Sequence, residues 1–134
     1  MINLNKIAHK IVSNDPNVSS TVIPEITRTL NGNYEWRVNG LLHREDGPAL
    51  EHKNGDKEWW VNGKCHRENG PAVEHANGAK SWYINGKRHR EDGPAVEMYN
   101  GNKAWYLNNK RIKYDPETWD QLVKEIHINN IMKT

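Results

Sequence analysis

The chain has 134 residues, a formal net charge of +2 and a hydrophobic fraction of 35%, which allows one domain with a small core and excludes a second catalytic module. Its 19 basic and 17 acidic residues nearly balance, so the chain lacks the strongly basic character of a dedicated duplex-DNA binder. No apolar run approaches the roughly 20 residues that span a bilayer, and the first residues lack the apolar segment of a secretory signal, so we expect no membrane association.

Residues 1–24 are predicted to form an N-terminal helical cap and a linker. One helical stripe carries apolar side chains, and the breaker-rich segment SNDPNVSS follows it. The stripe consists of Leu4, Ile7, Ala8, Ile11 and Val12.

An internal repeat dominates the middle of the chain. Segments that begin at Asn31, Asn54 and Asn77 share the pattern N-G-x-x-x-W-x-(V/I)-N-G-x-x-H-R-E-(D/N)-G-P-A, and a shorter copy begins at Asn100. The period is 23 residues with no insertion. The chain is therefore a repeat protein, which is a quasi-one-dimensional architecture.

Each repeat contains two extended runs, such as PAVEH and SWYI, and EITRTL at residue 25 supplies the first run of the first pair. An Asn-Gly pair lies between the two runs of each of four hairpins, which predicts a two-residue type I′ turn there. The longer return connection ends in Asp-Gly-Pro or Asn-Gly-Pro, whose glycine is predicted to take a positive φ. Four β-hairpins are thus expected over residues 25–109.

A two-residue turn fixes which side chains share a face. With Asn77 and Gly78 as the loop, Val73 lies opposite Trp82, and Trp82 and Ile84 point to the core. The equivalent core positions in the other hairpins are Trp36, Val38, Leu50, Trp59, Val61, Val96, Trp105 and Leu107. The same register sets Glu51 against Glu58, a like-charge pair that a bulged turn would relieve.

A C-terminal helical cap is predicted over residues 115–128. Asp115 is a suitable N-cap, and Pro116 suits the first helical position. Apolar residues then follow at helical spacing, at Trp119, Leu122, Val123 and Ile126. The expected fold is one mainly β domain over residues 1–134, an array of four β-hairpins between an N-terminal and a C-terminal helix. An open terminal hairpin would also allow edge-to-edge pairing into a homo-oligomer.

The repeat resembles the MORN repeat family, and it is most similar to variant MORN-like repeats of bacteriophages, large DNA viruses and bacterial antitoxin-like proteins. The segment from Trp82 to Ala95, WYINGKRHREDGPA, carries the resemblance, which extends over about residues 26–109. The chain departs from the common pattern where Arg44, Arg67 and Arg90 follow the histidine. The resemblance implies an elongated hairpin ribbon that acts as a binding platform and not as an enzyme.

The first candidate binding surface is a stripe on the second face of the predicted sheet. Arg37, Trp60, Tyr83 and Tyr106 occupy equivalent positions in successive repeats. The stripe is either covered by a terminal helix or exposed as an aromatic platform, and its residue types are those that dominate binding hot spots. Aromatics beside basic residues also suit the stacking of single-stranded nucleic acid.

The second candidate surface is the H-R-E-(D/N)-G-P connection, with Arg44, Arg67 and Arg90 and with His43, His66 and His89. The arginines either bond main-chain carbonyls of the adjacent repeat or offer their guanidinium groups to phosphates and carboxylates. Recurrence in every full repeat favours the structural role, because all repeats need the same turn.

Metal and catalytic chemistry have weak signals. Equivalent histidines lie about 10 Å apart at roughly 4.8 Å per strand, which is too far for one zinc ion. The single cysteine, Cys65, cannot form an internal disulfide, so a reducing cytoplasmic compartment is expected. The sequence has no phosphate-binding glycine loop, no G-x-S-x-G and no H-E-x-x-H.

The sequence therefore predicts a non-enzymatic binding protein with no cofactor and no metal. We expect it to be phage-encoded and to act in the host cytoplasm on a host protein, such as a defence or toxin component. A nucleic-acid or nucleotide-binding role that uses the arginines and aromatics is the alternative, and an enzyme of undetected type is the third interpretation.

Overall fold

Two different asparagine turns in each repeat determine the architecture. The computed structural model describes residues 6–8 and 24–132. Its elements are β1 (Lys6–Ala8), β2 (Glu25–Arg28), β3 (Tyr34–Val38), β4 (Leu41–Leu42), β5 (Leu50–Glu51), β6 (Lys57–Glu58), β7 (Trp60–Val61), β8 (Lys64–Cys65), β9 (Val73–Glu74), β10 (Lys80–Ser81), β11 (Tyr83–Ile84), β12 (Lys87–Arg88), β13 (Val96–Glu97), β14 (Lys103–Leu107), β15 (Lys110–Ile112) and the helix α1 (Trp119–Met132).

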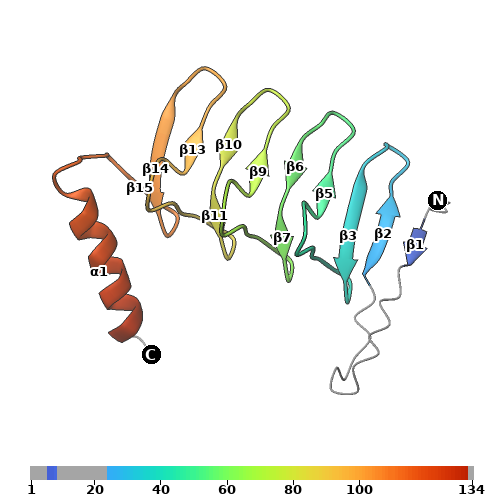
Figure 1. Ribbon diagram of the computed structural model, residues 1–134, viewed down its shortest axis with the longest axis horizontal. Coiled ribbons are helices and arrows are strands. Elements are labelled where there is room, and N and C mark those ends of the chain that lie inside the picture. The colour runs from blue at the N-terminus through green and yellow to red at the C-terminus, as the bar shows by residue number, and fades with distance from the viewer. Residues whose placement is uncertain (1–5, 9–23, 133–134) are drawn as a thin grey trace.

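The protein is mainly β, as predicted, and the four expected hairpins are β2–β3, β5–β6, β9–β10 and β13–β14. They line up antiparallel in one long sheet with the order β1-β2-β3-β5-β6-β9-β10-β13-β14-β15 (Figure 1). A second series of short hairpins was not predicted: β3–β4, β7–β8, β11–β12 and β14–β15. Each repeat therefore contributes two hairpins, one at each end of its tryptophan strand.

The turns of the long hairpins differ from the prediction. In the second hairpin the His52 N–H donates to the Asp56 carbonyl, and the Gly55 N–H donates to the His52 carbonyl. The loop thus has three residues, and Gly55 takes φ +97° at its end. This is the three-residue turn with a glycine bulge, in place of the expected two-residue type I′ turn.

Type I′ turns are present in the short hairpins instead. Asn62 and Gly63 join β7 to β8, and both have positive φ, 51° and 77°. The same conformation recurs at Asn39 and Gly40, at Asn85 and Gly86, and at Asn108 and Asn109. Asparagine tolerates this backbone region better than other side chains except glycine, which explains why these positions are Asn in every repeat.

The extra loop residue shifts the register of the long hairpins by one. Glu51 lies opposite Lys57 and not opposite Glu58, so the bulged turn relieves the like-charge pair. Val73 lies opposite Ser81 and not opposite Trp82. Because side chains alternate along a strand, Val73 is on the face away from Trp82, and the predicted core face is wrong for the first strand of each hairpin.

The new register creates a row of alternating charges on the tryptophan side of the sheet. Its members pair across neighbouring strands in the order Glu51, Lys57, Glu74, Lys80, Glu97 and Lys103. Opposite charges on directly opposed strand positions are favourable. Electrostatics therefore supports the observed register and opposes the two-residue alternative.

Between the repeats the buried interior is built from small side chains, and the predicted core residue Leu107 and Trp119 add larger buried side chains near the C-terminal end. Ala49, Ala72 and Ala95 are completely inaccessible to solvent. The Ala72 carbonyl accepts the Trp59 N–H at 2.7 Å, and the Ala72 N–H donates to the Ser81 carbonyl at 2.8 Å. The alanines thus lie where successive repeats bond to each other, and a larger side chain there would separate the strands.

The predicted N-terminal helix is contradicted at residues 6–8, the part of it that the structure describes. Lys6–Ala8 form strand β1, which pairs antiparallel with β2 through Ile7 opposite Ile26. Ile7 and Ala8, expected on a helix, therefore extend the sheet, which can offer hydrogen bonds to one more strand at its edge. The remaining helix positions Leu4, Ile11 and Val12 lie outside the described residues.

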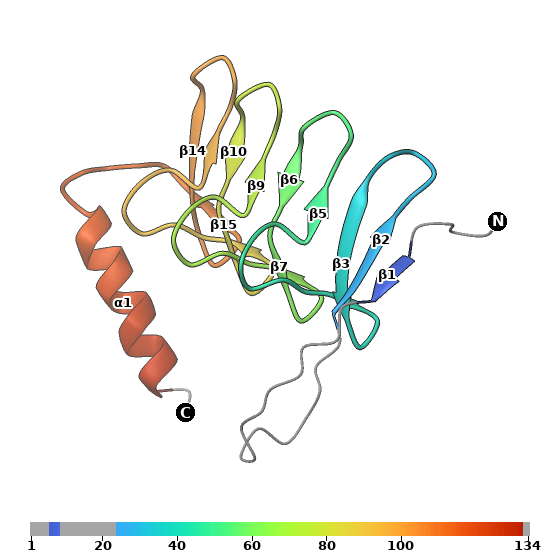
Figure 2. The same ribbon diagram turned by 45° about the vertical axis from the view of Figure 1, so that its right-hand side comes forward.

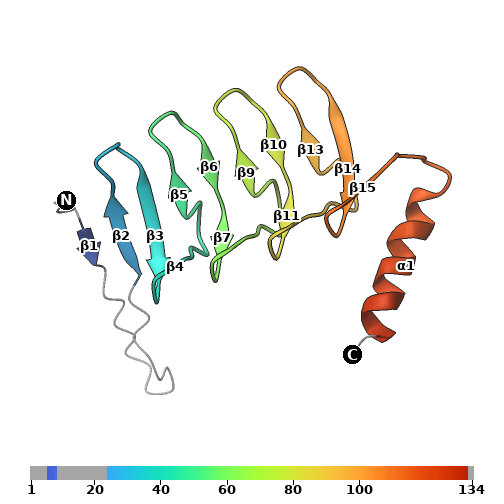
Figure 3. The same ribbon diagram turned by 180° about the vertical axis from the view of Figure 1, so that it is seen from behind.

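The C-terminal helix is present but displaced along the chain. α1 runs from Trp119 to Met132 and not over residues 115–128. The expected helix N-cap, Asp115, caps the turn that leads into α1, because its carboxylate accepts the Glu117 N–H at 2.9 Å. Figure 2 shows the long connections bulging from the sheet in series, with α1 following them, and Figure 3 shows β1 and α1 at opposite ends of the array. Within the described part of the chain, no helix combines the length and apolar character needed to cross a bilayer.

We expect that deleting residues 77–99 joins the second repeat to the fourth and leaves a shorter folded protein. The deletion keeps the 23-residue phase, and nearest-neighbour contacts carry most of the stability of such arrays. Circular dichroism and thermal unfolding should show one cooperative transition at a lower melting temperature. Deleting residues 77–98 shifts the phase by one residue, exchanges the strand faces and should abolish folding. Equal behaviour of the two deletions would contradict the register.

Candidate binding grooves

An arginine stacked on a tryptophan organises each long connection. The Arg67 guanidinium carbon lies 3.9 Å from the centroid of the Trp59 ring. The same guanidinium donates to the Pro71 carbonyl at 3.0 Å and pairs with Glu74 at 3.2 Å. Arg44 over Trp36 and Arg90 over Trp82 repeat this arrangement at 4.1 and 3.9 Å. We name the segments 43–48, 66–71 and 89–94 the arginine loops.

The arginine side chains bond within their own repeat, whereas the backbone N–H groups of these residues donate to carbonyls of the next repeat, at Trp60, Tyr83 and Tyr106. Arg44 and Arg90 donate to the carbonyls of Pro48 and Pro94, four residues further along each loop. Their Nε atoms also donate to Asp46 and Asp92 at 2.9 and 3.0 Å. Each guanidinium thus closes its loop. Whether it also contacts a ligand stays a prediction.

The glycine of each arginine loop is explained by space and not by backbone conformation. Gly47, Gly70 and Gly93 do not take the predicted positive φ. A Cβ atom at Gly93 would lie 2.7 Å from the Arg90 guanidinium carbon, which is closer than real Cβ atoms approach. The glycine therefore allows the guanidinium to pack directly against the loop backbone.

The three candidate histidines connect each repeat to the next. The Nδ1 atom of His66 accepts the N–H of Asn85 at 2.9 Å, and its Nε2 atom faces Glu68. His43 and His89 accept the N–H groups of Asn62 and Asn108 in the same way. These bonds need an unprotonated Nδ1. The histidines thus hold the type I′ turn of the following repeat.

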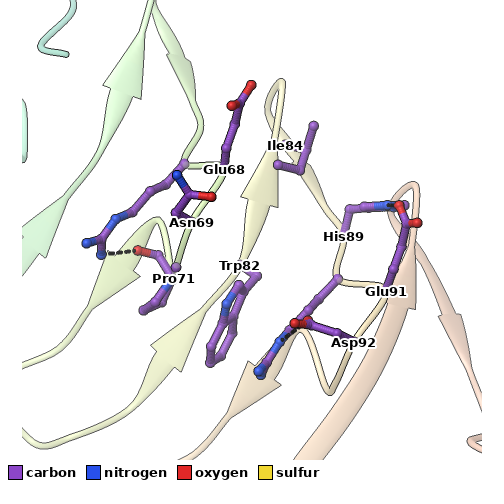
Figure 4. Close-up of a pocket in the computed structure, with 11 residues that line it drawn as sticks. Glu68, Asn69, Pro71, Trp82, Ile84, His89, Glu91 and Asp92 are labelled. Carbon is purple, nitrogen blue, oxygen red and sulfur yellow. Dashed lines mark hydrogen bonds and ion pairs between the residues drawn. The ribbon is translucent and has the colours of Figure 1, made fainter.

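Grooves lie between successive arginine loops, and each has a tryptophan at its floor. The Trp82 groove has a volume of about 550 Å³ and lies between loop 66–71 and loop 89–94. Figure 4 shows Trp82 between Asn69 and Pro71 on one side and His89, Glu91 and Asp92 on the other. The Trp59 groove, between loops 43–48 and 66–71, measures about 800 Å³. The two grooves are copies one repeat apart.

The rims of the two grooves are acidic and exposed. The side chains of Glu45, Asp46 and Glu68 are 85, 87 and 78% exposed. The hydrogen bond and charge of Arg44 lower the pKa of Asp46 below its usual value of 3.8. The rims are therefore negatively charged at neutral pH and suit a cationic partner better than a phosphate.

The third copy, the Trp105 groove, is occupied by the chain itself, although Trp105 and Tyr114 also line a hollow of about 560 Å³ with Lys103 and Arg111. Tyr114 stacks on Trp105 with 3.7 Å between ring centroids, in the position that an arginine takes in the other repeats. Trp119 of α1 meets Trp105 edge-on at 4.8 Å and donates its Nε1–H to the Glu91 carbonyl at 2.7 Å. His127 of α1 contacts the Glu91 carboxylate at 2.6 Å. α1 thus closes the array.

Glu91 shows the electrostatic effect of this closure. Burial opposes its ionisation, but the hydrogen bonds from His89 and His127 outweigh burial and lower the pKa of Glu91 below its usual value of 4.5. His89 lies 2.8 Å from Glu91, whereas His66 lies 3.7 Å from Glu68 in the open groove. The histidine–glutamate contact is therefore shorter in the repeat that α1 covers than in the open Trp82 groove.

The aromatic stripe lies on the other face of the sheet. Trp60 and Tyr83 line a hollow of about 350 Å³ together with Cys65 and Val73. The Arg88 guanidinium lies over Tyr83 and Tyr106, at 5.8 and 5.5 Å from their centroids. The structure thus brings these three aromatics together. The fourth member, Arg37, instead donates to the Gly40 carbonyl and to Glu35 in its own hairpin.

Two groups in this hollow limit the chemistry of the stripe. The Trp60 Nε1–H is buried and has no hydrogen-bond partner among the described residues. Burial, assisted by the charge of Glu58, raises the pKa of the Cys65 thiol to about 12. The thiolate is the reactive form of cysteine, so Cys65 is a poor nucleophile at neutral pH. Across residues 6–8 and 24–132, no group of three His, Cys, Asp or Glu side chains is placed to hold a metal ion.

Sequence reasoning missed the grooves because it assigned Trp59 and Trp82 to the core. A signal was present: an arginine follows each of Trp36, Trp59 and Trp82 after eight residues, but Lys113 stands at that spacing from Trp105. The absence of the arginine marks the repeat whose groove α1 occupies.

Comparison with known proteins finds no relative. No family model matches the chain, and no curated protein or solved structure matches it. The resemblance to MORN repeats stays a prediction from the repeat pattern.

We expect Arg67→Gln to lower the free energy of unfolding by about 2 kcal/mol, because it removes the stacking on Trp59 and the charge-assisted bond to the Pro71 carbonyl. Urea denaturation measures the loss. Arg111→Gln changes an exposed arginine outside the loops and should cost less than about 0.5 kcal/mol. Equal losses would show that the loop arginines do not hold the loops.

We expect the melting temperature to fall as the pH drops below about 4. The folded-state pKa values of Asp46, Asp56 and Glu91 are lowered, so the unfolded chain binds more protons in the acidic range. The stabilisation is complete above the unfolded pKa values and is lost as the pH falls through the folded ones. Glu91→Gln should weaken this dependence, as measured by calorimetry from pH 7 to pH 2.5, whereas Glu117→Gln should leave it unchanged.

Proposed function

We propose that this chain is a non-enzymatic binding protein that recognises another protein through the Trp59 and Trp82 grooves. The observation that supports this most strongly is the recurrence of one groove, with an aromatic floor and exposed carboxylates at its rim. Aromatic side chains in concave sites are typical of protein-binding hot spots. The loop fold uses the arginine and the glycine, but it leaves the carboxylates of Glu45 and Glu68 largely exposed.

The biological setting of the proposal comes from the resemblance to MORN-like repeats. In that setting the chain is phage-encoded and acts in the host cytoplasm on a host protein such as a defence or toxin component. The elongated array suits this role, because it presents equivalent sites in series and so gains affinity from several contacts at once.

A second candidate function, binding of single-stranded nucleic acid, is favoured by the stripe and not by the arginine loops. Trp60, Tyr83 and Tyr106 lie near Arg88, and aromatics beside cations stack bases. The loop arginines are engaged in their loops, and the acidic rims beside them repel phosphate.

Capture from a bacterial lysate treated with nuclease tests the proposal. We expect the wild-type chain to retain a protein at 0.3 M salt, and the variant Glu45→Lys with Glu68→Lys to retain at least tenfold less. The matched control is Glu117→Lys with Glu125→Lys, which makes the same charge change in the turn before α1 and on α1 itself. In a parallel capture from the same lysate without nuclease, retention of nucleic acid that weakens steeply with salt and is lost in Arg88→Gln would replace the proposal with the second candidate.

A further inference from the structure

The filled Trp105 groove shows what the two open grooves can accept. Four contacts place α1 there: the Trp119 ring against Trp105, the same ring edge-on to Tyr114 at 5.8 Å, the Trp119 Nε1–H on the Glu91 carbonyl, and His127 on the Glu91 carboxylate. Trp119 is only 5% exposed, and it is the only residue of α1 that is buried. One indole therefore anchors this helix.

The open grooves present the same tryptophan and glutamate one and two repeats earlier, with Arg90 and Arg67 stacked on the floor in place of Tyr114. Trp82 and Glu68 correspond to Trp105 and Glu91, and Trp59 and Glu45 correspond to them one further repeat back. Among the described residues, the carbonyls of Glu45 and Glu68 accept no hydrogen bond. The Glu68 side chain is 78% exposed where that of Glu91 is 36% exposed. The difference is the cover that α1 supplies.

We infer that each open groove receives a tryptophan carried by a helix of a partner protein, in the pose that Trp119 takes in the Trp105 groove. The inference rests on the proposed function and names the chemistry of the partner. A second copy of this chain is not the occupant, because its own Trp119 is already buried in its own third groove.

The indole is specified by the contacts that the groove offers. An aromatic ring packs against the tryptophan floor, and a ring N–H reaches the carbonyl of the loop glutamate. Phenylalanine lacks that donor. A histidine or another cation two helical turns further along reaches the exposed carboxylate, as His127 does eight residues after Trp119. The partner helix is therefore amphipathic, with one tryptophan and a cationic side chain on the same face.

The spacing of the grooves fits more than one helix. Successive repeats are two strands apart, about 10 Å, and packed helices lie 8–10 Å apart. α1 runs roughly along the strand direction, across the long axis of the array (Figures 1 and 3). Two partner helices seated in the open grooves would thus lie side by side and continue the row that α1 begins.

A peptide with the sequence of residues 113–132 is the probe, because it contains Tyr114, Trp119 and His127. It is titrated into the full-length protein labelled with ¹⁵N. We expect saturable shifts at the Trp59 and Trp82 indole signals and at the Glu45 and Glu68 amides. The same peptide with Trp119→Ala should bind at least about tenfold more weakly.

A double-mutant cycle tests the pose. Glu45→Gln with Glu68→Gln in the protein and His127→Ala in the peptide should each weaken binding about threefold. Together they should weaken it no more than either alone, because both remove one contact. Glu117→Gln in the protein is the control, and the melting temperature of each variant verifies the fold.

Three results would overturn the inference: no saturable binding, shifts confined to Trp105 and Glu91, or shifts on the Trp60 and Tyr83 face. Shifts confined to the Trp105 groove would mean that the peptide only displaces α1. These failures differ from failure of the proposed function. If the grooves capture a protein but the peptide does not bind them, the tryptophan chemistry is wrong while the binding role stands.

Discussion

The arginine stacked on a tryptophan is the interaction on which the rest of this repeat depends. A guanidinium between an indole and a loop backbone gains cation–π attraction on one side and directional hydrogen bonds on the other. Arg67 reaches Trp59, the Pro71 carbonyl and Glu74 at once. Loop 66–71 lines both open grooves, so loss of the arginine that closes it would disturb both together.

The same interaction explains three residue types in the motif. Glycine leaves room for the guanidinium, because a Cβ at Gly70 would lie 3.1 Å from the Arg67 guanidinium carbon and would crowd it. Proline offers a carbonyl for the arginine. The aspartate of two loops fixes Nε, and Asn69, which stands in its place in the middle loop, makes no such bond. The arginine, glycine and proline of the motif therefore have structural roles. The glutamate is free of these roles and can contact other groups.

The period, the four long hairpins and a capping role of Asp115 could be predicted from sequence because each is a local property. The register could not, because Asn-Gly suits both a two-residue turn and the end of a three-residue turn with a bulge. The choice depends on a partner strand, where Glu51 meets either Glu58 or Lys57. That one-residue difference moved Val73 to the opposite face from Trp82, and the groove was consequently mistaken for core.

An open-ended array must also stop. If the fourth repeat kept its arginine loop, a further groove would be left at the end of the sheet. The chain instead places Tyr114 on Trp105 and turns Trp119 back onto Glu91. The last groove is thus occupied by a side chain that the sequence carries once outside the repeats, on a helix that makes few other buried contacts. The two open grooves in the middle of the array have the same backbone and the same glutamate carbonyl as the groove that holds Trp119. The features that let α1 end the array are therefore also present in the open grooves.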